Sequence, residues 1–199
     1  MKIAVYNKKG GAGKTPISYA IACNYYFHLA TNELSVYNNI HPNNTPVDSV
    51  AYEDAFKQYD TNMDVVFDLG GMLSKSGLSI VSAIEQSDVL VVPMFDDITP
   101  QGIRGASVLG GLTTLLEASA ITRNIVVVVT KLSNINLDTD KILPSYQNSQ
   151  SFLRIKELVG KAGNRLNIEI PCFPSSNSTI YSNMWGQNKS MKQMLEENS

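Results

Sequence analysis

The chain has 199 residues, 43% of them hydrophobic, and a formal net charge of −2, so it is long enough for one compact domain with a full core. Its two cysteines, Cys23 and Cys172, show neither C-x-x-C nor Cys/His ligand spacing, which excludes a disulfide framework and a cysteine metal site. No apolar run approaches the roughly 20 residues of a membrane span, so we expect one soluble cytoplasmic domain over residues 1–199 with no membrane partner.

A glycine-rich loop follows the first predicted strand. The apolar run Ile3–Tyr6 leads into Asn7-Lys8-Lys9-Gly10-Gly11-Ala12-Gly13-Lys14-Thr15, and a helical pattern follows. The glycines let the backbone aim N–H groups at an anion, and the helix start and Lys14 add positive charge. The Thr15 hydroxyl can face a magnesium ion. The pattern predicts a phosphate site, although Lys8 stands where the ordinary motif has its first glycine.

Residues 9–15 resemble the deviant phosphate loop of the ParA/MinD family of dimerising ATPases, which carries a second lysine just before the glycines. The resemblance implies a P-loop fold, ATP or ADP with Mg²⁺ as ligands, and a homodimer that forms with ATP. It also implies that Lys14 binds the nucleotide of its own chain and that Lys9 reaches the nucleotide of the partner. The other nucleotide-binding residues implied here are Gly10, Gly11, Ala12, Gly13, Thr15 and Pro16.

Pro16 departs from the family pattern, which has a second hydroxyl residue at this position. Proline is tolerated in a first helical turn, but it removes an N–H that such loops aim at the α-phosphate. One nucleotide contact of the family is therefore missing from the predicted site.

The segment Leu34–Asn43 predicts a second strand that runs into a loop. The family has Asp-x-Asp-Pro-Gln at the end of this strand, and alignment on Pro42 places Asn39 and His41 at the two acidic positions. Because the second carboxylate positions the attacking water in the family, we expect slow hydrolysis, with the neutral imidazole of His41 as the candidate base. Alternatively, His41 is a spectator in an asparagine-rich turn, and the chain is a hydrolysis-deficient ATP-binding dimerisation or regulatory module.

Further along, apolar runs alternate with helical patterns, which is typical of a mainly parallel sheet flanked by helices on both faces, a three-layer α/β/α fold. The expected elements are a helix at Asp48–Tyr59, a strand at Asp64–Leu69, a helix at Leu78–Ser87, a strand at Asp88–Met94, a helix at Gln101–Ala118 and a strand at Asn124–Lys131.

Asp68 ends the buried strand at 64–69 and is followed by Gly70 and Gly71, which resembles the Walker B segment of the family. Ligands bind at the carboxyl ends of strands in open α/β sheets, and a carboxylate there suits magnesium held through water. Asp68 and Thr15 are therefore the predicted metal site. The two glycines leave room for phosphate and for a moving loop.

Two strand ends later in the chain invite a functional interpretation. Asp96 and Asp97 precede a helix, and we interpret them as partners of its positive end rather than as a metal site. The strand at 124–131 is the most hydrophobic, so we expect it near the centre of the sheet. By resemblance, Thr130 at its end is the residue that contacts the base.

Ser151–Gly163 reads as an amphipathic helix that carries a basic face. Arg154, Lys161 and Arg165 lie nearly in line at helical spacing, a geometry that can follow a phosphate backbone, although a solvated charged face is the alternative. Residues 1–99 carry 6 Lys/Arg and 11 Asp/Glu, and residues 100–199 carry 10 and 7, so a polyanion would favour the C-terminal half.

The C-terminal region completes the expected fold. It comprises a short strand at Ile168–Pro171, a loop at Pro171–Ser178 that resembles the loop closing over the base in the family, and a helix at Thr179–Glu197. Acidic residues offset the lysines of that helix, which does not favour membrane binding.

The resemblance implies a role in partition of plasmid or other DNA. ATP would form a dimer that binds DNA non-specifically and associates with the nucleoid, and a small DNA-binding, ParB-like adaptor would trigger release. Apart from the hydrolysis-deficient module, two alternatives are considered. A reductase similar to the nitrogenase iron protein would need cluster cysteines after Asp68, and none occurs there. A small-molecule kinase would need an acceptor pocket, of which the sequence gives no sign.

Overall fold

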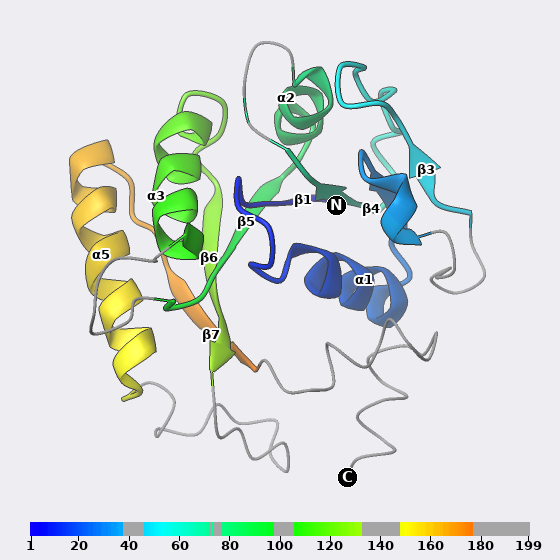
Figure 1. Ribbon diagram of the computed structural model, residues 1–199. Helices are drawn as coiled ribbons and strands as arrows, with labels where there is room; N and C mark the ends of the chain where they lie inside the picture. The colour runs from blue at the N-terminus through cyan, green and yellow to red at the C-terminus, as the bar shows by residue number, and fades with distance from the viewer. Residues whose placement is uncertain (38–45, 72, 74–76, 98–105, 133–147, 177–199) are drawn as a thin grey trace, which may run out of the picture.

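A parallel β-sheet forms the centre of the molecule (Figure 1). The computed structural model describes residues 1–37, 46–71, 73, 77–97, 106–132 and 148–176. These residues form a seven-stranded sheet of order β3-β2-β4-β1-β5-β6-β7, in which every neighbouring pair is parallel. The strands are β1 (Lys2–Tyr6), β2 (His28–Thr31), β3 (Asp48–Ser49), β4 (Val65–Leu69), β5 (Val89–Met94), β6 (Ile125–Leu132) and β7 (Cys172–Ser176).

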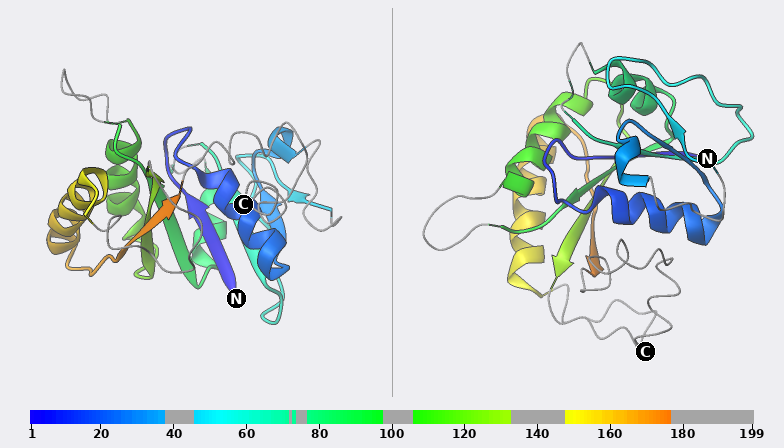
Figure 2. Two further views of the ribbon diagram at one scale, coloured as in Figure 1. Left: turned by 90° about the horizontal axis from the view of Figure 1, so that it is seen from below. Right: turned by 45° about the vertical axis from the view of Figure 1, so that its right-hand side comes forward.

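Helices cover both faces of this sheet (Figure 2). They are α1 (Lys14–Tyr25), the short 3-10 helix η1 (Leu34–Tyr37), α2 (Leu78–Glu85), α3 (Ala106–Ala118) and α5 (Gln150–Leu166). Side chains alternate between the faces of a strand, so Val5 packs with α1 and η1, whereas Ala4 and Tyr6 pack with α2, α3 and α5. The predicted three-layer α/β/α fold is confirmed.

The prediction that the strand at 124–131 lies near the centre is wrong. β1 is the central strand, with β4 on one side and β5 on the other, and β6 lies next to the edge strand β7. Ile125, Val127 and Val129 are buried on the face that α5 covers, whereas Val126 and Val128 on the other face are only partly buried, so the hydrophobic run does not require a central place.

The prediction of a second strand at Leu34–Asn43 is also wrong. Helix α1 ends on Tyr26, whose left-handed φ of 59° turns the chain, and β2 begins two residues later at His28. The strand ends at Thr31, and Leu34–Tyr37 forms η1 instead. β2 therefore ends well before Pro42, the residue by which the sequence analysis placed the end of this strand.

Two further elements differ from expectation. The segment predicted as a helix at Asp48–Tyr59 begins with β3 and continues without helix, and the rings of Phe56 and Tyr59 pack edge-to-face on Phe67 at 5.1 and 5.6 Å. The spacing of Phe56 and Tyr59 therefore reflects their packing against β4 and not a helix. The last strand is β7, Cys172–Ser176, rather than Ile168–Pro171, so part of the predicted base-closing loop belongs to the sheet.

The expected strands at 64–69 and 88–94 and the helices at 78–87 and 151–163 are confirmed within a few residues at each end. The helix expected from Gln101 is described from Ala106 onwards. His41 and residues 177–199 lie outside the described residues, and so do the predictions that rest on them. Over the described ranges, no helix combines the length and the apolar character needed to cross a membrane.

Candidate nucleotide site

The loop from Asn7 to Gly13 joins the central strand β1 to the start of α1. Gly11 and Gly13 have φ angles of 74° and 99°, which side chains disfavour. Helix α1 starts on Gly13 without a side-chain hydrogen bond as its cap and without an acidic residue in its first turn. Its first N–H groups and the positive end of its dipole are thus left for an anion.

Asn7 shapes the first half of this loop. Its side chain is fully buried; Nδ2 donates to the carbonyls of Pro93 at 2.7 Å and Ser107 at 3.3 Å, and Oδ1 accepts from the Lys9 N–H at 2.9 Å. One amide therefore links the loop to the end of β5 and to the first turn of α3. Asp97 accepts from the Ser107 N–H at 3.0 Å, which confirms its predicted place at the start of that helix.

Thr130 supports the second half of the loop. Its buried hydroxyl shares its one proton between the carbonyls of Ala12 at 2.9 Å and Met94 at 3.2 Å. Its methyl carbon lies 3.4 Å from the position that a Cβ on Gly13 would take. The structure gives Thr130 a role in holding the phosphate loop, which the sequence did not suggest. Contact of this residue with the base stays a prediction.

The two lysines of the motif lie differently. Lys14 is only 8% exposed, and its Nζ donates to the Lys9 carbonyl at 3.4 Å, so the charge lies against the loop. Lys9 is exposed, and its stem packs on Gly110 of α3, where an added Cβ would come within 2.5 Å of Lys9 Cγ. The structure thus brings Lys14 into the predicted site and leaves Lys9 at the surface beside it.

Asp68 lies at the end of β4 with no exposed surface. Its Oδ2 accepts from the Tyr37 hydroxyl at 2.7 Å and its Oδ1 from the Ser18 hydroxyl at 3.3 Å, and the Thr15 hydroxyl bonds to the same carboxyl group. Burial is the largest influence on the pKa of Asp68 and raises it, while the bonds from Tyr37 and Thr15 and the charge of Lys14 act in the opposite direction. A cation beside this carboxyl group would favour its charged form.

The pair formed by Thr15 and Asp68 fits a magnesium ion. Magnesium uses hard oxygen ligands and keeps several waters, with phosphate oxygens completing its shell. Within the part of the chain that the structure describes, no group of three or more His, Cys, Asp or Glu residues could hold a metal by itself. The hydroxyl of Thr15, the carboxylate of Asp68, water and a bound phosphate would have to share the ion.

Tyr37 and Ser18 were missed by sequence reasoning. Ser18 lies one turn after Lys14 on α1, and its hydroxyl also bonds to the Lys14 carbonyl at 3.1 Å, so its helical spacing from Lys14 was a usable signal. Tyr37 reaches Asp68 only because η1 folds back beneath the sheet, and no local pattern indicates this.

An acidic residue, Glu33, follows the end of β2. Thr31 pairs with Asp68 in the parallel register, and its hydroxyl donates to the Asp68 carbonyl and accepts from the Glu33 N–H, both at 2.9 Å. The Glu33 carboxyl group lies directly over Gly70, where an added Cβ would come within 1.9 Å of Glu33 Cδ. Glu33 is therefore at the strand end next to Asp68, where His41 was expected. The premise for His41 is wrong, and its role as a base stays a prediction outside the described residues.

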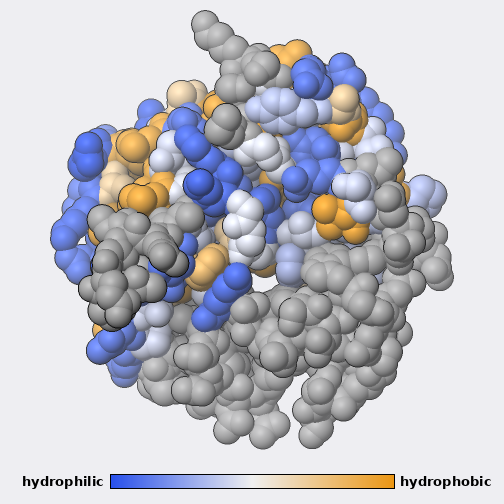
Figure 3. Space-filling view, viewed as in Figure 1, coloured by the Kyte–Doolittle hydropathy of each residue, from blue (hydrophilic) through white to orange (hydrophobic). Residues whose placement is uncertain are grey.

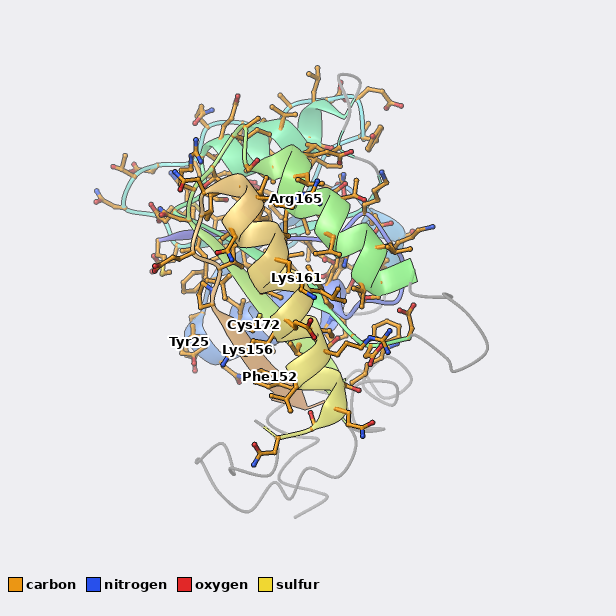
Figure 4. The ribbon with its side chains drawn as sticks, turned by 90° about the vertical axis from the view of Figure 1, so that its left-hand side faces the viewer. Tyr25, Phe152, Lys156, Lys161, Arg165 and Cys172 are labelled. Carbon is orange, nitrogen blue, oxygen red and sulfur yellow. The ribbon has the colours of Figure 1, made fainter. Side chains whose placement is uncertain are left out.

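The proposed DNA face lies on the outer side of α5. Arg154, Lys161 and Arg165 are exposed, whereas Phe152 and other apolar residues of α5 are buried (Figure 4). Lys161 forms an ion pair with Glu157 one turn earlier, so the face is less basic than the three cations suggest. Its binding to DNA stays a prediction.

Hydrophobic surface also lies on this side of the molecule. On the face shown in Figure 3, hydrophobic residues gather over α3 and α5, where Leu109, Leu116 and Leu153 are about half exposed. Single exposed leucines are ordinary on protein surfaces, and we assign them no role.

A parallel sheet of this order, a glycine loop from its central strand into an uncapped helix, and a Thr15 hydroxyl bonded to the buried Asp68 define the P-loop NTPase fold. Among solved structures, the fold is shared with apo McdA from Cyanothece, with a TM-score of 0.59 and 11% identity over 99% of this chain and 94% of McdA. It is shared equally with the ATP complex of a McdA variant from Cyanothece, with a TM-score of 0.59 and 13% identity over 100% of this chain and 92% of the other.

McdA is a ParA/MinD-type protein, so the fold expected from that resemblance is confirmed. At these identities the likeness establishes the fold alone. No protein-family model matches the chain, and no curated protein sequence matches it.

Proposed function

We propose that this chain is an ATPase of the ParA/MinD type that binds ATP with Mg²⁺ and hydrolyses it slowly. The observation that carries the proposal is the phosphate loop, in which Lys14 lies against the loop and Lys9 stands exposed at its edge. The McdA variant with the same fold was solved as an ATP complex, which supports a nucleoside triphosphate as the ligand.

The residues divide into two tasks in this proposal. The loop N–H groups and Lys14 hold the phosphates, while Thr15 and Asp68 hold the magnesium ion, which neutralises phosphate charge. Glu33, over Gly70 and near Asp68, is the group that orients water and accepts its proton. The alternative, a hydrolysis-deficient dimerisation module, loses support because a carboxylate stands at the strand end.

We expect ATP to drive formation of a homodimer through Lys9. Lys9→Ala should keep ATP binding by the monomer but lose the ATP-dependent dimer, because the exposed ammonium group would reach the partner's nucleotide. A cation supplied in trans to a transferring phosphoryl group is worth about 10³–10⁵ in rate, so turnover should fall as well. Sedimentation velocity with and without Mg-ATP measures the dimer.

Lys8→Ala is the matched control for this test. Lys8 precedes Lys9, but its ammonium group pairs with Glu117 at 3.7 Å and its N–H bonds to Thr114, so its loss should leave the dimer intact. An ATP-dependent dimer of Lys9→Ala as strong as that of the wild type would contradict the assignment.

The proposed biological role is partition of plasmid or other DNA by a cytoplasmic protein that associates with the nucleoid when ATP is bound. The ATP dimer would bind DNA without sequence preference, and a ParB-like adaptor would stimulate release. The exposed cations of α5 support this role, and a dimer would present two such faces, which gives avidity to a weak patch.

We expect duplex DNA to bind only in the presence of ATP, and binding to weaken with salt by about 0.9 logarithmic units per tenfold salt increase for each phosphate contacted. Joint replacement of Arg154, Lys161 and Arg165 by alanine should abolish retention in a mobility-shift assay. Glu157→Gln should do the opposite and strengthen binding, because it frees Lys161 from its ion pair.

Lys57→Ala serves as the control, since Lys57 is exposed but pairs with Asp48 of the edge strand β3. It should leave DNA binding unchanged. Full retention of DNA by the triple variant would move the contact away from α5, with Lys189 and Lys192 as the next candidates.

A further inference from the structure

The side chain of Asn32 binds both backbone groups of Gly70. The Gly70 N–H donates to Asn32 Oδ1 at 2.7 Å, and Asn32 Nδ2 donates to the Gly70 carbonyl at 3.0 Å. Asn32 directly precedes Glu33, and Gly70 lies two residues after Asp68. One amide therefore joins the end of β2 to the loop that follows β4, with two bonds of good length.

The same amide extends to α2. Asn32 Nδ2 also donates to the Ser79 hydroxyl at 2.9 Å, and that hydroxyl donates to the Tyr52 carbonyl at 2.9 Å. Ser79 lies in the first turn of α2 and is fully buried. A displacement of Gly70 must therefore break or shift a hydrogen-bond chain that passes through Ser79 of α2 and ends at the Tyr52 carbonyl, outside the nucleotide site.

The loop is held on its other side by β1. The Tyr6 hydroxyl accepts from the Leu73 N–H at 2.7 Å and donates to the Gly71 carbonyl at 3.3 Å. Tyr6 is the last residue of β1, immediately before the phosphate loop. The segment after Asp68 is thus fixed between the two strand ends that carry Glu33 and the phosphate loop.

Close packing above this segment explains why its position matters. The Glu33 carboxyl group rests on Gly70, and the Tyr52 ring rests on Gly71, where an added Cβ would come within 2.5 Å of the ring. Gly71 also has a φ of 90°. Gly70 therefore packs directly against the carboxyl group of Glu33.

We propose that Asn32 is a positioning residue that fixes Gly70 beneath the Glu33 carboxyl group and couples this part of the site to α2. The inference rests on the proposed ATPase function for its kinetic consequence. Within the described residues, the hydrogen bonds of Asn32 go to Gly70 and Ser79 and not to the phosphate loop, so its effect should fall on turnover and not on binding.

The first test uses hydrogen–deuterium exchange of the nucleotide-free protein and does not depend on activity. Asn32→Ala should accelerate exchange at residues 70–73 and in the first turn of α2, while the rest of the sheet stays protected. Asn124→Ala is the matched control, because Asn124 Nδ2 also donates to a backbone carbonyl, that of Asp88 at 3.0 Å, before β6. Unchanged exchange at Gly70 in Asn32→Ala would overturn the inference.

The second test separates turnover from binding. Because displacement of a catalytic group by about 1 Å can cost roughly 10²-fold in rate, Asn32→Ala should lower kcat by about that factor and leave the dissociation constant for ATP unchanged. Asn32→Asp retains the acceptor for the Gly70 N–H and loses the donor to the Gly70 carbonyl. Its kcat should therefore lie between the kcat values of the wild type and of Asn32→Ala. Equal losses in binding and kcat would indicate general damage and overturn the positioning role.

Ser79→Ala is a second variant that tests the proposal if Asn32→Ala does not fold. It keeps both bonds between Asn32 and Gly70 and removes the two bonds of the Ser79 hydroxyl, to Asn32 and to the Tyr52 carbonyl, so exchange should rise in α2 and stay low at Gly70. Equal exchange in α2 of Ser79→Ala and the wild type would overturn the coupling. If the wild type hydrolyses no ATP, the proposed ATPase function fails, whereas the exchange results still decide the role of Asn32.

Discussion

Replacement of Glu33 by glutamine should reduce ATP turnover by about 10²–10⁴-fold, which corresponds to about 3–5 kcal/mol of activation free energy at 1.36 kcal/mol per decade. Glutamine keeps the size of the side chain that rests on Gly70 but cannot accept a proton from water. ATP binding should not weaken, because the loop and Lys14 hold the phosphates. Single-turnover hydrolysis by the ATP-loaded protein measures the effect.

His41 variants provide the comparison for this experiment. If Glu33 is the base, His41→Ala should hydrolyse ATP at the wild-type rate. Turnover should then not fall between pH 7 and about pH 6, the range in which a histidine base with its ordinary pKa near 6.5 would become protonated. If His41 is the base, turnover should decline below about pH 6.5, and His41→Asp should preserve it. Wild-type turnover by Glu33→Gln would exclude the assignment of Glu33.

Replacement of Lys14 by alanine should abolish measurable binding of ATP and ADP. The Lys14 ammonium group lies against the loop and is almost covered, and hydrogen bonds of a charged group contribute about 1.5–3 kcal/mol each. The loss of two such bonds corresponds to roughly 10²–10⁴-fold in affinity. Isothermal titration with each nucleotide measures the change.

The thermal unfolding transition of Lys14→Ala serves as its control. Within the described residues, the Lys14 ammonium group makes a long hydrogen bond to the Lys9 carbonyl and its charge acts on the buried Asp68, so we expect a lowered midpoint, but a cooperative transition shows that the variant is folded. Lys57→Ala, an exposed cation far along the chain, should bind nucleotide normally. Unchanged ATP affinity of a folded Lys14→Ala protein would show that the loop is not the nucleotide site.

Local chemistry made much of the fold and of the phosphate site predictable. The strand before the loop, the glycines and the helix after it follow each other directly, so Gly11, Gly13 and Lys14 were predicted without knowledge of distant contacts. The buried strand that ends in Asp68 and the amphipathic pattern of α5 were equally local signals. In each case the residues that decide the structure lie within one or two turns or strands of one another.

Predictions failed where a short segment could satisfy two patterns. Phe56 and Tyr59 have helical spacing, yet both rings pack on Phe67 from a segment without helix, because burial against β4 outweighs the weak preference for helix. Leu34–Tyr37 has the apolar character of a strand, but β2 had already ended at Thr31. Because the strand end was misplaced, His41 was predicted as the candidate base, whereas Glu33 is the acidic residue that follows the true end of β2.

The sequence by itself determined the phosphate loop, the alternation that makes a parallel sheet, and the carboxylate at the end of β4. Only the tertiary structure decided which groups meet that carboxylate and the loop after it. Tyr37 reaches Asp68 across 31 residues, and Asn32 reaches Gly70 across 38. These contacts arise because β2 pairs with β4 in parallel register, with Thr31 opposite Asp68, and such pairing depends on the burial of whole strands rather than on any local pattern.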